Sequence, residues 1–272
     1  MDEPSDDLST MIGAARVAGS GLMRRFRHPS ELRVQEKGPA DYVSNADLES
    51  EQTLKSILLG AHPARGFMAE EGAPEQAGTP LDRERYIVDP LDGTTNFLHG
   101  VPHFAVSIAL EKEGRIVAGV VFDPAKDEMF ATELGRGAWA GSEALGVSPD
   151  ADLSNALVAT GIPHSNARHR HERYLGMLGA MMGEAAGIRR LGAAALDLAY
   201  VAAGRFGLFF EVGLSRWDIA GGALLVEEAG GRVTDPAGGD GFLSTGNVLA
   251  TNGRLHPRAL SLLGEAKRPN RS

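Results

Sequence analysis

Hydrophobic residues near the start of the chain recur with the spacing of an amphipathic helix. The i, i+3, i+4, i+7 pattern is set by Leu8, Met11, Ile12 and Ala15. Side chains at these intervals share one face of a helix, so the pattern predicts a helix over about residues 6–26.

A second helix is expected between Ser44 and Gly60. Leu54 and Leu58 repeat the helical spacing, and Gly60 suits a helix C-terminus. Asp47 stands three residues after Ser44, which resembles an N-terminal capping arrangement. Capping alone is therefore one sufficient explanation of Asp47.

Shorter β-prone runs follow the two helices. Residues 66–70 and 85–89 each end at carboxylates, where a strand is expected to pass into a loop. Alternating apolar residues over 104–110, 116–122 and 128–132 are separated by turn-forming pairs, which predicts an antiparallel meander. The first half of the chain is thus expected to be α+β.

The pattern changes after Pro149 to alternating strands and helices, which indicates a mixed α/β half. The expected strands cover residues 157–160, 188–191 and 206–211, and the expected helices about 168–183, 194–203, 216–229 and 256–266. No long linker rich in Pro or Ser separates the halves. We therefore expect two packed subdomains, residues 1–148 and 149–272.

Composition narrows the class of protein. The chain of 272 residues has 27 Lys plus Arg against 36 Asp plus Glu, a net charge of −9, which disfavours direct nucleic-acid binding. The absence of cysteine excludes thiolate chemistry and leaves metals to oxygen or imidazole ligands. The acidic start and the lack of any apolar run near 18 residues predict a cytoplasmic protein that does not bind membranes.

The segment over residues 89–97 carries the clearest chemical signal. It reads Asp-Pro-Leu-Asp-Gly-Thr-Thr-Asn-Phe, so Asp89 and Asp92 leave a strand and enter a turn. Two carboxylates aimed at one point suit Mg²⁺, whose remaining ligands are water and substrate phosphate. Backbone N–H groups of Gly93 to Thr95 would face an anion if they open a helical turn. The alternative is an aspartate-rich turn without a ligand.

Two other motifs that contain acidic residues are ambiguous when each is taken alone. Glu70 and Glu71 end the preceding strand, and Trp217 with Asp218 opens a predicted helix, where a first-turn aspartate could simply cap. Together with residues 89–97 they resemble the inositol monophosphatase family. Its marks are a glutamate pair after a strand, a DPxDGTTNF segment, and a WDxA helix start followed by a glycine pair, here Gly230-Gly231. The order and spacing fit over about residues 41–252.

The resemblance implies a fold of alternating α-β-α-β-α layers, a homodimer, and a phosphomonoesterase that uses two to three Mg²⁺ ions. The implied metal ligands are Glu70, Asp89, the Leu91 carbonyl, Asp92 and Asp218. The implied catalytic residues are Asp47 and the Thr94 hydroxyl, which would orient the attacking water, and Glu70. The implied substrate-binding residues are Gly93 and Thr94 for phosphate, and Asp92, Ala194, Glu211 and Asp218 for the alcohol.

The expected substrate is myo-inositol 1-phosphate or a similar small polyol phosphate. The family also includes enzymes for histidinol phosphate, fructose 1,6-bisphosphate and 3′-phosphoadenosine nucleotides, and a branch that acts in transcription antitermination through partner contacts. Two departures from the family pattern bear on substrate contacts and not on the ligand carboxylates. Gly72 stands where Ser or Thr is frequent, and the stretch Gly192-Ala193-Ala194 lacks the hydroxyl residue that often occurs there. The segment around Lys37 resembles the family's mobile loop, and residues 38–40 are expected to form a loop.

Other hydrolase signatures are missing from the chain. The acids of residues 89–92 are spaced D-x-x-D and not D-x-D, and neither G-x-S-x-G nor a P-loop occurs in the chain. Among polar residues outside the motifs, His103 is expected to be a packed structural residue, and Arg189 and Arg190 remain unassigned. A polar segment mixed with arginine favours a solvated helix start for His164, His169 and His171.

Overall fold

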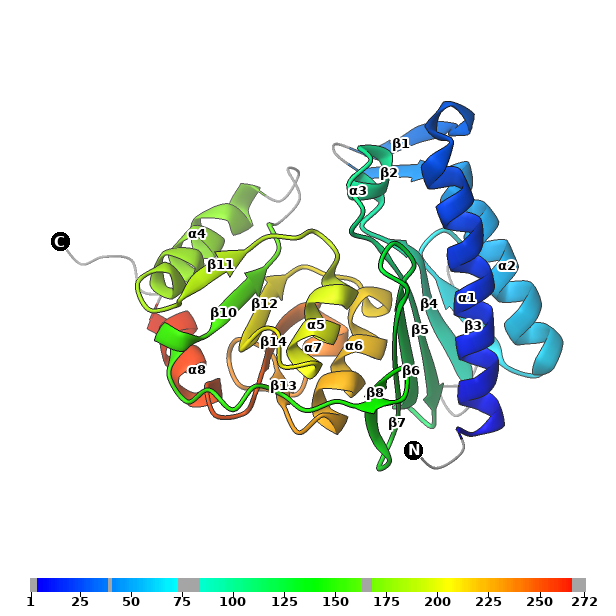
Figure 1. Ribbon diagram of the computed structural model, residues 1–272. Helices are drawn as coiled ribbons and strands as arrows, with labels where there is room; N and C mark the ends of the chain where they lie inside the picture. The colour runs from blue at the N-terminus through cyan, green and yellow to red at the C-terminus, as the bar shows by residue number, and fades with distance from the viewer. Residues whose placement is uncertain (1–3, 39–40, 73–83, 163–167, 266–272) are drawn as a thin grey trace.

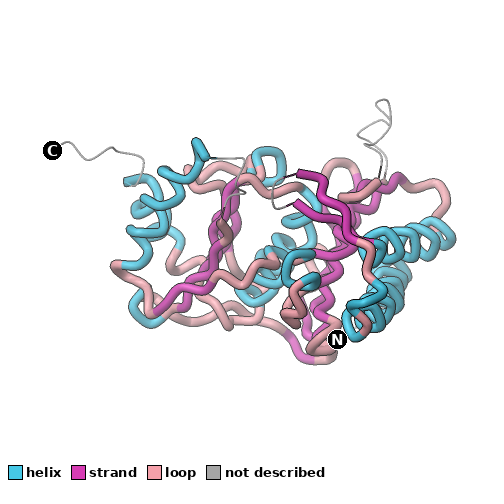
Figure 2. The backbone as a smooth tube through the Cα atoms, turned by 90° about the horizontal axis from the view of Figure 1, so that it is seen from above, coloured by secondary structure: helices cyan, strands magenta, loops and turns pink. Residues whose placement is uncertain are grey.

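The computed structural model describes residues 4–38, 41–72, 84–162 and 168–265. Helices and sheets alternate in five layers, in the order helix, sheet, helix, sheet, helix (Figure 1). Seen from above, the two groups of strands stand apart, with helices between them and outside them (Figure 2). The layered fold expected from the sequence is confirmed.

The first sheet has seven strands in the order β3-β4-β5-β6-β7-β8-β9. Only the β3–β4 pair is parallel, and the other neighbours are antiparallel. The strands are β3 (Gly66–Ala69), β4 (Arg85–Asp92), β5 (Ala105–Lys112), β6 (Arg115–Asp123), β7 (Glu128–Glu133), β8 (Gly137–Ala140) and β9 (Glu143–Ala144). The predicted meander is therefore present and is extended by two short strands that were not predicted.

The outer helices α1 (Asp6–Arg27) and α2 (Asn45–Ala61) cover one face of this sheet (Figure 1). The apolar stripe of α1 is buried, as its spacing predicts, and Ser5 caps its start. Gly19 permits close approach, because a Cβ there would lie 2.6 Å from the Phe122 ring. The capping arrangement predicted at Ser44 and Asp47 is present at the start of α2.

The middle layer contains α5 (Ala194–Ala202) and α6 (Arg216–Glu228), which pack against each other and against both sheets. All nine residues of α5 are buried, as expected for a helix that is apolar on nearly every face; Asp197 is its one acidic residue. Gly221 of α6 lies so near β6 that a Cβ on Gly119 would be 2.7 Å from its carbonyl oxygen. The contact fixes α6, and with it Asp218, against the first sheet.

The second sheet has the order β11-β10-β12-β14-β13. β10 is parallel to β11 and β12, whereas β14 is antiparallel to β12 and β13. Its strands are β10 (Leu157–Thr160), β11 (Gly187–Arg189), β12 (Leu208–Val212), β13 (Arg232–Thr234) and β14 (Asn247–Thr251). The outermost helices are α4 (Arg168–Met182) and α8 (His256–Glu265) (Figure 1), and short turns are η1 (Pro29–Glu31), α3 (Thr94–Leu98), η2 (Leu153–Asn155) and α7 (Phe242–Thr245).

Two expectations about local structure need correction. A hairpin, β1 (Val34–Gly38) with β2 (Asp41–Ser44), includes residue 38, which was expected in a loop. Most of β1 is exposed, so it has no apolar alternation by which a sequence pattern could reveal it. In addition, β4 does not stop at Asp89 but continues to Asp92. No helix in the described ranges has the length and hydropathy needed to cross a membrane.

Candidate active site

An irregularity in β4 brings two aspartates to one face of the first sheet. Asp89 pairs with Ser107 and Asp92 with Ala105, so three steps along β4 match two along β5. Because side chains alternate along a strand, the extra residue returns Asp92 to the face of Asp89. Pro90 lies inside this bulge, where a residue without an N–H is tolerated. Both carboxylates are buried, with Asp89 1% and Asp92 8% exposed.

The first turn of α5 holds the Asp92 carboxylate. The backbone N–H of Ala194 donates to Asp92 Oδ1 over 3.2 Å, and that of Ala195 donates to Oδ2 over 2.8 Å. These are free N–H groups of a helix start, which favour a negative charge. Burial is the larger effect, and it raises the pKa of Asp92 to about 6. Ala194, predicted at the alcohol side, thus contacts the site through its backbone.

Asp218 reaches the same place from the first turn of α6. The Ser215 N–H donates to Asp218 Oδ2 over 2.7 Å, so the residue also caps its helix. A hydrogen bond joins the Asp89 and Asp218 carboxyl groups. Burial, followed by the charge of Asp92, raises the pKa of Asp218 to about 8. Burial also raises the pKa of Asp89 well above its usual value, and the charges of Glu70, Asp92 and Asp218 add to this.

Glu70, directly after β3, completes this carboxylate group and meets a lysine. Burial raises the pKa of Glu70 to about 7, with the charge of Lys37 opposing and that of Glu71 adding. Lys37 Nζ lies 3.2 Å from Glu70 Oε1 and 2.7 Å from Glu71 Oε1. Burial by itself would lower the pKa of Lys37, but hydrogen bonds and charge from Glu70 and Glu71 raise it above its usual value. The β1 hairpin therefore borders the site.

The donor chemistry of this group fits a hard divalent cation. The four side chains supply only carboxylate oxygens, they are largely buried, and their charges repel one another. Buried carboxylates at such density are stabilised in the ionised form by a bound cation. In the part of the chain that the structure describes, no three acidic or histidine side chains already converge closely enough to hold a metal ion.

Asp47 and Thr94 are linked beside this group. Asp47 is 1% exposed, and its Oδ2 accepts from the Ser44 N–H over 2.9 Å and from the Ser44 hydroxyl over 2.6 Å. Its other oxygen, Oδ1, lies 3.0 Å from Thr94 Oγ1, which also lies 3.0 Å from the Leu91 carbonyl oxygen. Asp47 therefore uses one oxygen to cap α2 and presents the other to Thr94.

The turn at Gly93 needs glycine for two reasons. Its φ of 88° lies in the left-handed region, and a Cβ there would lie 3.1 Å from the His103 carbonyl oxygen and 3.2 Å from that of Gly192. The Asn96 amide joins the same segments, donating to the carbonyls of His103 and Leu191, each over 2.8 Å. The sequence analysis gave no role to Asn96. In the structure it links α3 to the segment before β5 and to the segment before α5.

Glu211 belongs to β12 and therefore approaches the site from the second sheet. A Cβ on Gly161 would lie 1.9 Å from the Glu211 carboxylate, so this glycine leaves the space that the carboxylate fills. Burial raises the pKa of Glu211 to about 8, the charges of Asp218 and Asp92 add to this, and Arg190 opposes them. Glu211 thus belongs to the same acidic neighbourhood as the β4 and α6 carboxylates.

Asp197 of α5 is an acidic residue that the sequence analysis missed. It is 1% exposed, and among the described residues its buried Oδ1 has no hydrogen-bond partner. Burial raises its pKa well above the usual value, with added effects from Glu211 and Asp92. The sequence signal that could have revealed Asp197 is a single acidic residue within an otherwise apolar predicted helix.

Two histidines outside the site, His103 and His256, are buried, and burial lowers the pKa of each to about 4. His103 Nδ1 lies 3.4 Å from Lys126 Nζ. This is compatible with the packed role expected for it. His169 and His171 lie at the start of α4, and His164 lies outside the described residues.

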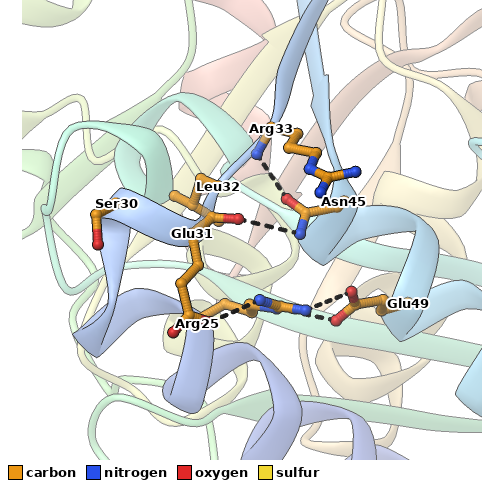
Figure 3. A pocket seen from close by; sticks show the side chains of 7 residues that line it. All are labelled: Arg25, Ser30, Glu31, Leu32, Arg33, Asn45 and Glu49. Carbon is orange, nitrogen blue, oxygen red and sulfur yellow. Dashed lines mark hydrogen bonds and ion pairs between the residues drawn. The ribbon is translucent and has the colours of Figure 1, made fainter.

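A separate polar cavity of about 520 Å³ lies between the end of α1 and the start of α2 (Figure 3). None of the residues predicted for the site lines it. Its lining includes Arg25, whose guanidinium contacts the carboxylates of Glu31 and Glu49 over 2.8 and 2.6 Å (Figure 3). Because these ion pairs already occupy Arg25, the cavity does not compete with the carboxylate group as the candidate site.

The five-layer fold with its group of acidic side chains is that of a family of phosphatases. A model of the inositol monophosphatase family matches residues 3–268, and the chain belongs to that family of phosphatases. The inositol-1-monophosphatase of Rhizobium meliloti is 51% identical, over 90% of this chain and 91% of the relative. The Nus factor SuhB of Pseudomonas aeruginosa is 45% identical, over 94% and 95%. A crystal structure of the suppressor protein suhB from Bartonella henselae, 46% identical, has a TM-score of 0.90 and covers 95% of this chain and 98% of its own.

Proposed function

We propose that the protein is a Mg²⁺-dependent phosphomonoesterase that hydrolyses myo-inositol 1-phosphate, or a similar small polyol phosphate, to the alcohol and inorganic phosphate. The observation that carries this proposal is the group of carboxylates formed by the buried Asp89 and Asp92 and the half-buried Asp218 and Glu70, drawn from both halves of a chain of this family. Structural ion pairing does not explain the group. Lys37 pairs with Glu70, but among the described residues no cation forms an ion pair with Asp89, Asp92 or Asp218.

The residues that would hold two to three Mg²⁺ ions are Glu70, Asp89, the Leu91 carbonyl, Asp92 and Asp218. When bound, Mg²⁺ supplies Lewis-acid activation of water and neutralises charge on the phosphate and the leaving oxygen. The N–H groups of Ala194 and Ala195 fix the orientation of the Asp92 carboxylate, and the N–H of Ser215 fixes that of Asp218. The two helices thus keep the carboxylates aligned without a rearrangement during turnover.

Asp47 and Thr94 would orient the attacking water. With the Thr94 hydroxyl donating to Asp47 over 3.0 Å, the Thr94 oxygen keeps lone pairs that accept a hydrogen bond from that water. The N–H groups of Gly93 and Thr94 would bind the phosphate, since they open α3 beyond the Gly93 turn. Glu211 and the Ala194 end of α5 would border the alcohol.

A regulatory role is the second candidate, because a relative that is 45% identical carries the name Nus factor. A net charge of −9 makes protein contacts, and not direct RNA binding, the expected mode of any such role. We also propose a cytoplasmic homodimer that binds neither nucleic acid nor membranes directly, with subdomains over residues 1–148 and 149–272.

The test is phosphate release from a panel of esters with and without Mg²⁺. The panel contains myo-inositol 1-phosphate, histidinol phosphate, fructose 1,6-bisphosphate and a 3′-phosphoadenosine nucleotide. We expect Mg²⁺-dependent release that is fastest with the inositol ester, and loss of release in Asp89→Asn. Absence of metal-dependent release from every ester would refute the phosphatase function. If Asp89→Asn abolished release but left the cellular phenotype unchanged, the regulatory role would be favoured.

A further inference from the structure

The Asn96 side chain joins separate segments beside the proposed phosphate-binding turn, which consists of Gly93 and Thr94. Its Nδ2 donates to the carbonyl oxygens of His103 and Leu191, each over 2.8 Å. A primary amide has two N–H groups, so these two bonds use both of them. His103 lies just before β5 and Leu191 just before α5. One side chain of α3 therefore reaches a segment that lies 95 residues further along the chain.

Gly93 packs against the same two segments. A Cβ on Gly93 would lie 3.1 Å from the His103 carbonyl oxygen and 3.2 Å from that of Gly192, so a side chain would be crowded there. Asn96 follows Gly93 within one turn of α3, which is closed by the Phe97 N–H donating to the Gly93 carbonyl over 3.0 Å. The hydrogen bonds of Asn96 therefore hold in place the backbone against which the phosphate-binding turn packs.

The segment beyond Leu191 holds a proposed metal ligand. The start of α5, three residues after Leu191, donates two backbone N–H groups to the Asp92 carboxylate. These are the N–H groups of Ala194 and Ala195, over 3.2 and 2.8 Å. Because Asn96 ties Leu191 to α3, it also fixes the start of α5 relative to the turn that follows Asp92. Removing the amide would leave two carbonyl oxygens without this donor and would release the tether.

We propose that Asn96 is a positioning residue of the active site. By joining the phosphate-binding turn to the start of α5, it keeps the N–H groups of Gly93 and Thr94 aligned with the Asp92 carboxylate. This inference rests on the proposed function. Asn96 acts through these groups and not on the ester, since both of its N–H groups are already used. A misalignment of about 1 Å in an active site can cost about 100-fold in rate, so such a link affects turnover.

The first experiment compares Asn96→Ala with the wild-type protein on myo-inositol 1-phosphate at saturating Mg²⁺, with inorganic phosphate as the competitive inhibitor. We expect kcat/KM to fall at least about tenfold and the inhibition constant of phosphate to rise at least about tenfold, because the turn loses its alignment. Asn96→Asp is a second variant of the same size, and its ionised carboxylate has no N–H to donate. It should lose at least as much as Asn96→Ala.

Asn252→Ala is the matched control, because Asn252 makes the same kind of link away from the site. Its Nδ2 donates to the carbonyl oxygens of Ser148 over 3.0 Å and of Asp150 over 2.7 Å. Ser148 lies beside Gly204, which follows the C-terminal end of α5. The melting temperature of Asn252→Ala should fall about as much as that of Asn96→Ala. Its kinetic constants should stay within about twofold of wild type at a temperature at which both variants are folded.

A second measurement needs neither substrate nor metal. Amide hydrogen exchange of Ala194 and Ala195 in the metal-free protein reports how firmly the start of α5 holds Asp92. Exchange at both amides should be at least about tenfold faster in Asn96→Ala than in wild type, and within about twofold of wild type in Asn252→Ala.

The outcomes separate this inference from the proposed function. The inference is overturned if Asn96→Ala leaves either the phosphate inhibition constant or the amide exchange within about twofold of wild type, or if Asn252→Ala changes both as much. If Asn96→Ala does not fold, Asn96→Asp decides by the same criteria. If the wild-type protein releases phosphate from no ester of the panel with Mg²⁺, the proposed function fails, and the exchange experiment still decides whether Asn96 positions the start of α5.

Discussion

The Thr94 hydroxyl lies 3.0 Å from Asp47 Oδ1 and thereby joins the start of α3 to the first turn of α2. Asp47 is a helix-capping residue and a candidate catalytic residue at once, because its two oxygens face different partners. The two roles can be separated, since an amide can replace a carboxylate in a cap more readily than in orienting a water.

Asp47→Asn is expected to leave the fold and metal affinity nearly intact and to lower kcat by at least about 100-fold. Asparagine keeps an acceptor oxygen for the Ser44 N–H, so the melting temperature should change little. Steady-state kinetics and calorimetric Mg²⁺ titration measure the two effects. Asp152→Asn, at the exposed cap of η2, is the control. Unchanged turnover in Asp47→Asn would remove the catalytic role.

Asp89→Asn is expected to abolish Mg²⁺-dependent phosphate release and to raise the melting temperature of the metal-free protein by a few degrees. Asp89 is 1% exposed and is surrounded by the charges of Glu70, Asp92 and Asp218. A neutral amide removes that repulsion and the cost of burying the charge. Melting in EDTA tests this, and a lower melting temperature would show that the carboxylate has a structural role.

Between about pH 6.5 and 8, the stability of the metal-free protein is expected to fall as pH rises. The folded-state pKa values of Glu70, Asp218 and Glu211, about 7, 8 and 8, lie above those of unfolded carboxyl groups. In this window the folded state binds more protons than the unfolded state, so the free energy of unfolding decreases with pH. His103 and His256, whose pKa is lowered to about 4, are neutral here when folded.

Saturating Mg²⁺ should weaken or reverse this pH dependence, because a bound cation favours the ionised carboxylates. Melting curves at several pH values, in EDTA and in Mg²⁺, provide the comparison. Parallel curves with and without the metal would mean that Mg²⁺ does not bind these acids.

Gly161→Ala is expected to lower kcat/KM for the inositol ester severalfold, with little effect on phenyl phosphate. The new Cβ would lie 1.9 Å from the Glu211 carboxylate and would displace it. Because the displaced group is the end of a flexible side chain, the melting temperature should change little. Gly21→Ala in α1 is the control, since a Cβ there meets nothing within 4 Å. Equal losses with both esters would argue against an alcohol-side role for Glu211.

Local pattern was sufficient to predict most of the fold. The positions of α1, α2, α5 and α6 follow from apolar spacing and caps, which depend on neighbours a few residues away. The β1–β2 hairpin escaped prediction because its strands are polar and exposed, and only their backbone pairing marks them. The bulge in β4 also escaped, because the register of β5 reveals it and the sequence of β4 does not.

By itself, the sequence determined the family and the order of its acidic motifs, since residues 89–97, Glu70 and Trp217-Asp218 are short segments with recognisable spacing. Only the tertiary structure decided which side chains meet. Asp92 is held by Ala194, 102 residues further along the chain, and Gly161 leaves the space for Glu211. Lys37 of the β1 hairpin contacts Glu70 at the end of β3. Such contacts depend on the packing of separate layers, so no local pattern of hydrophobic and polar residues encodes them.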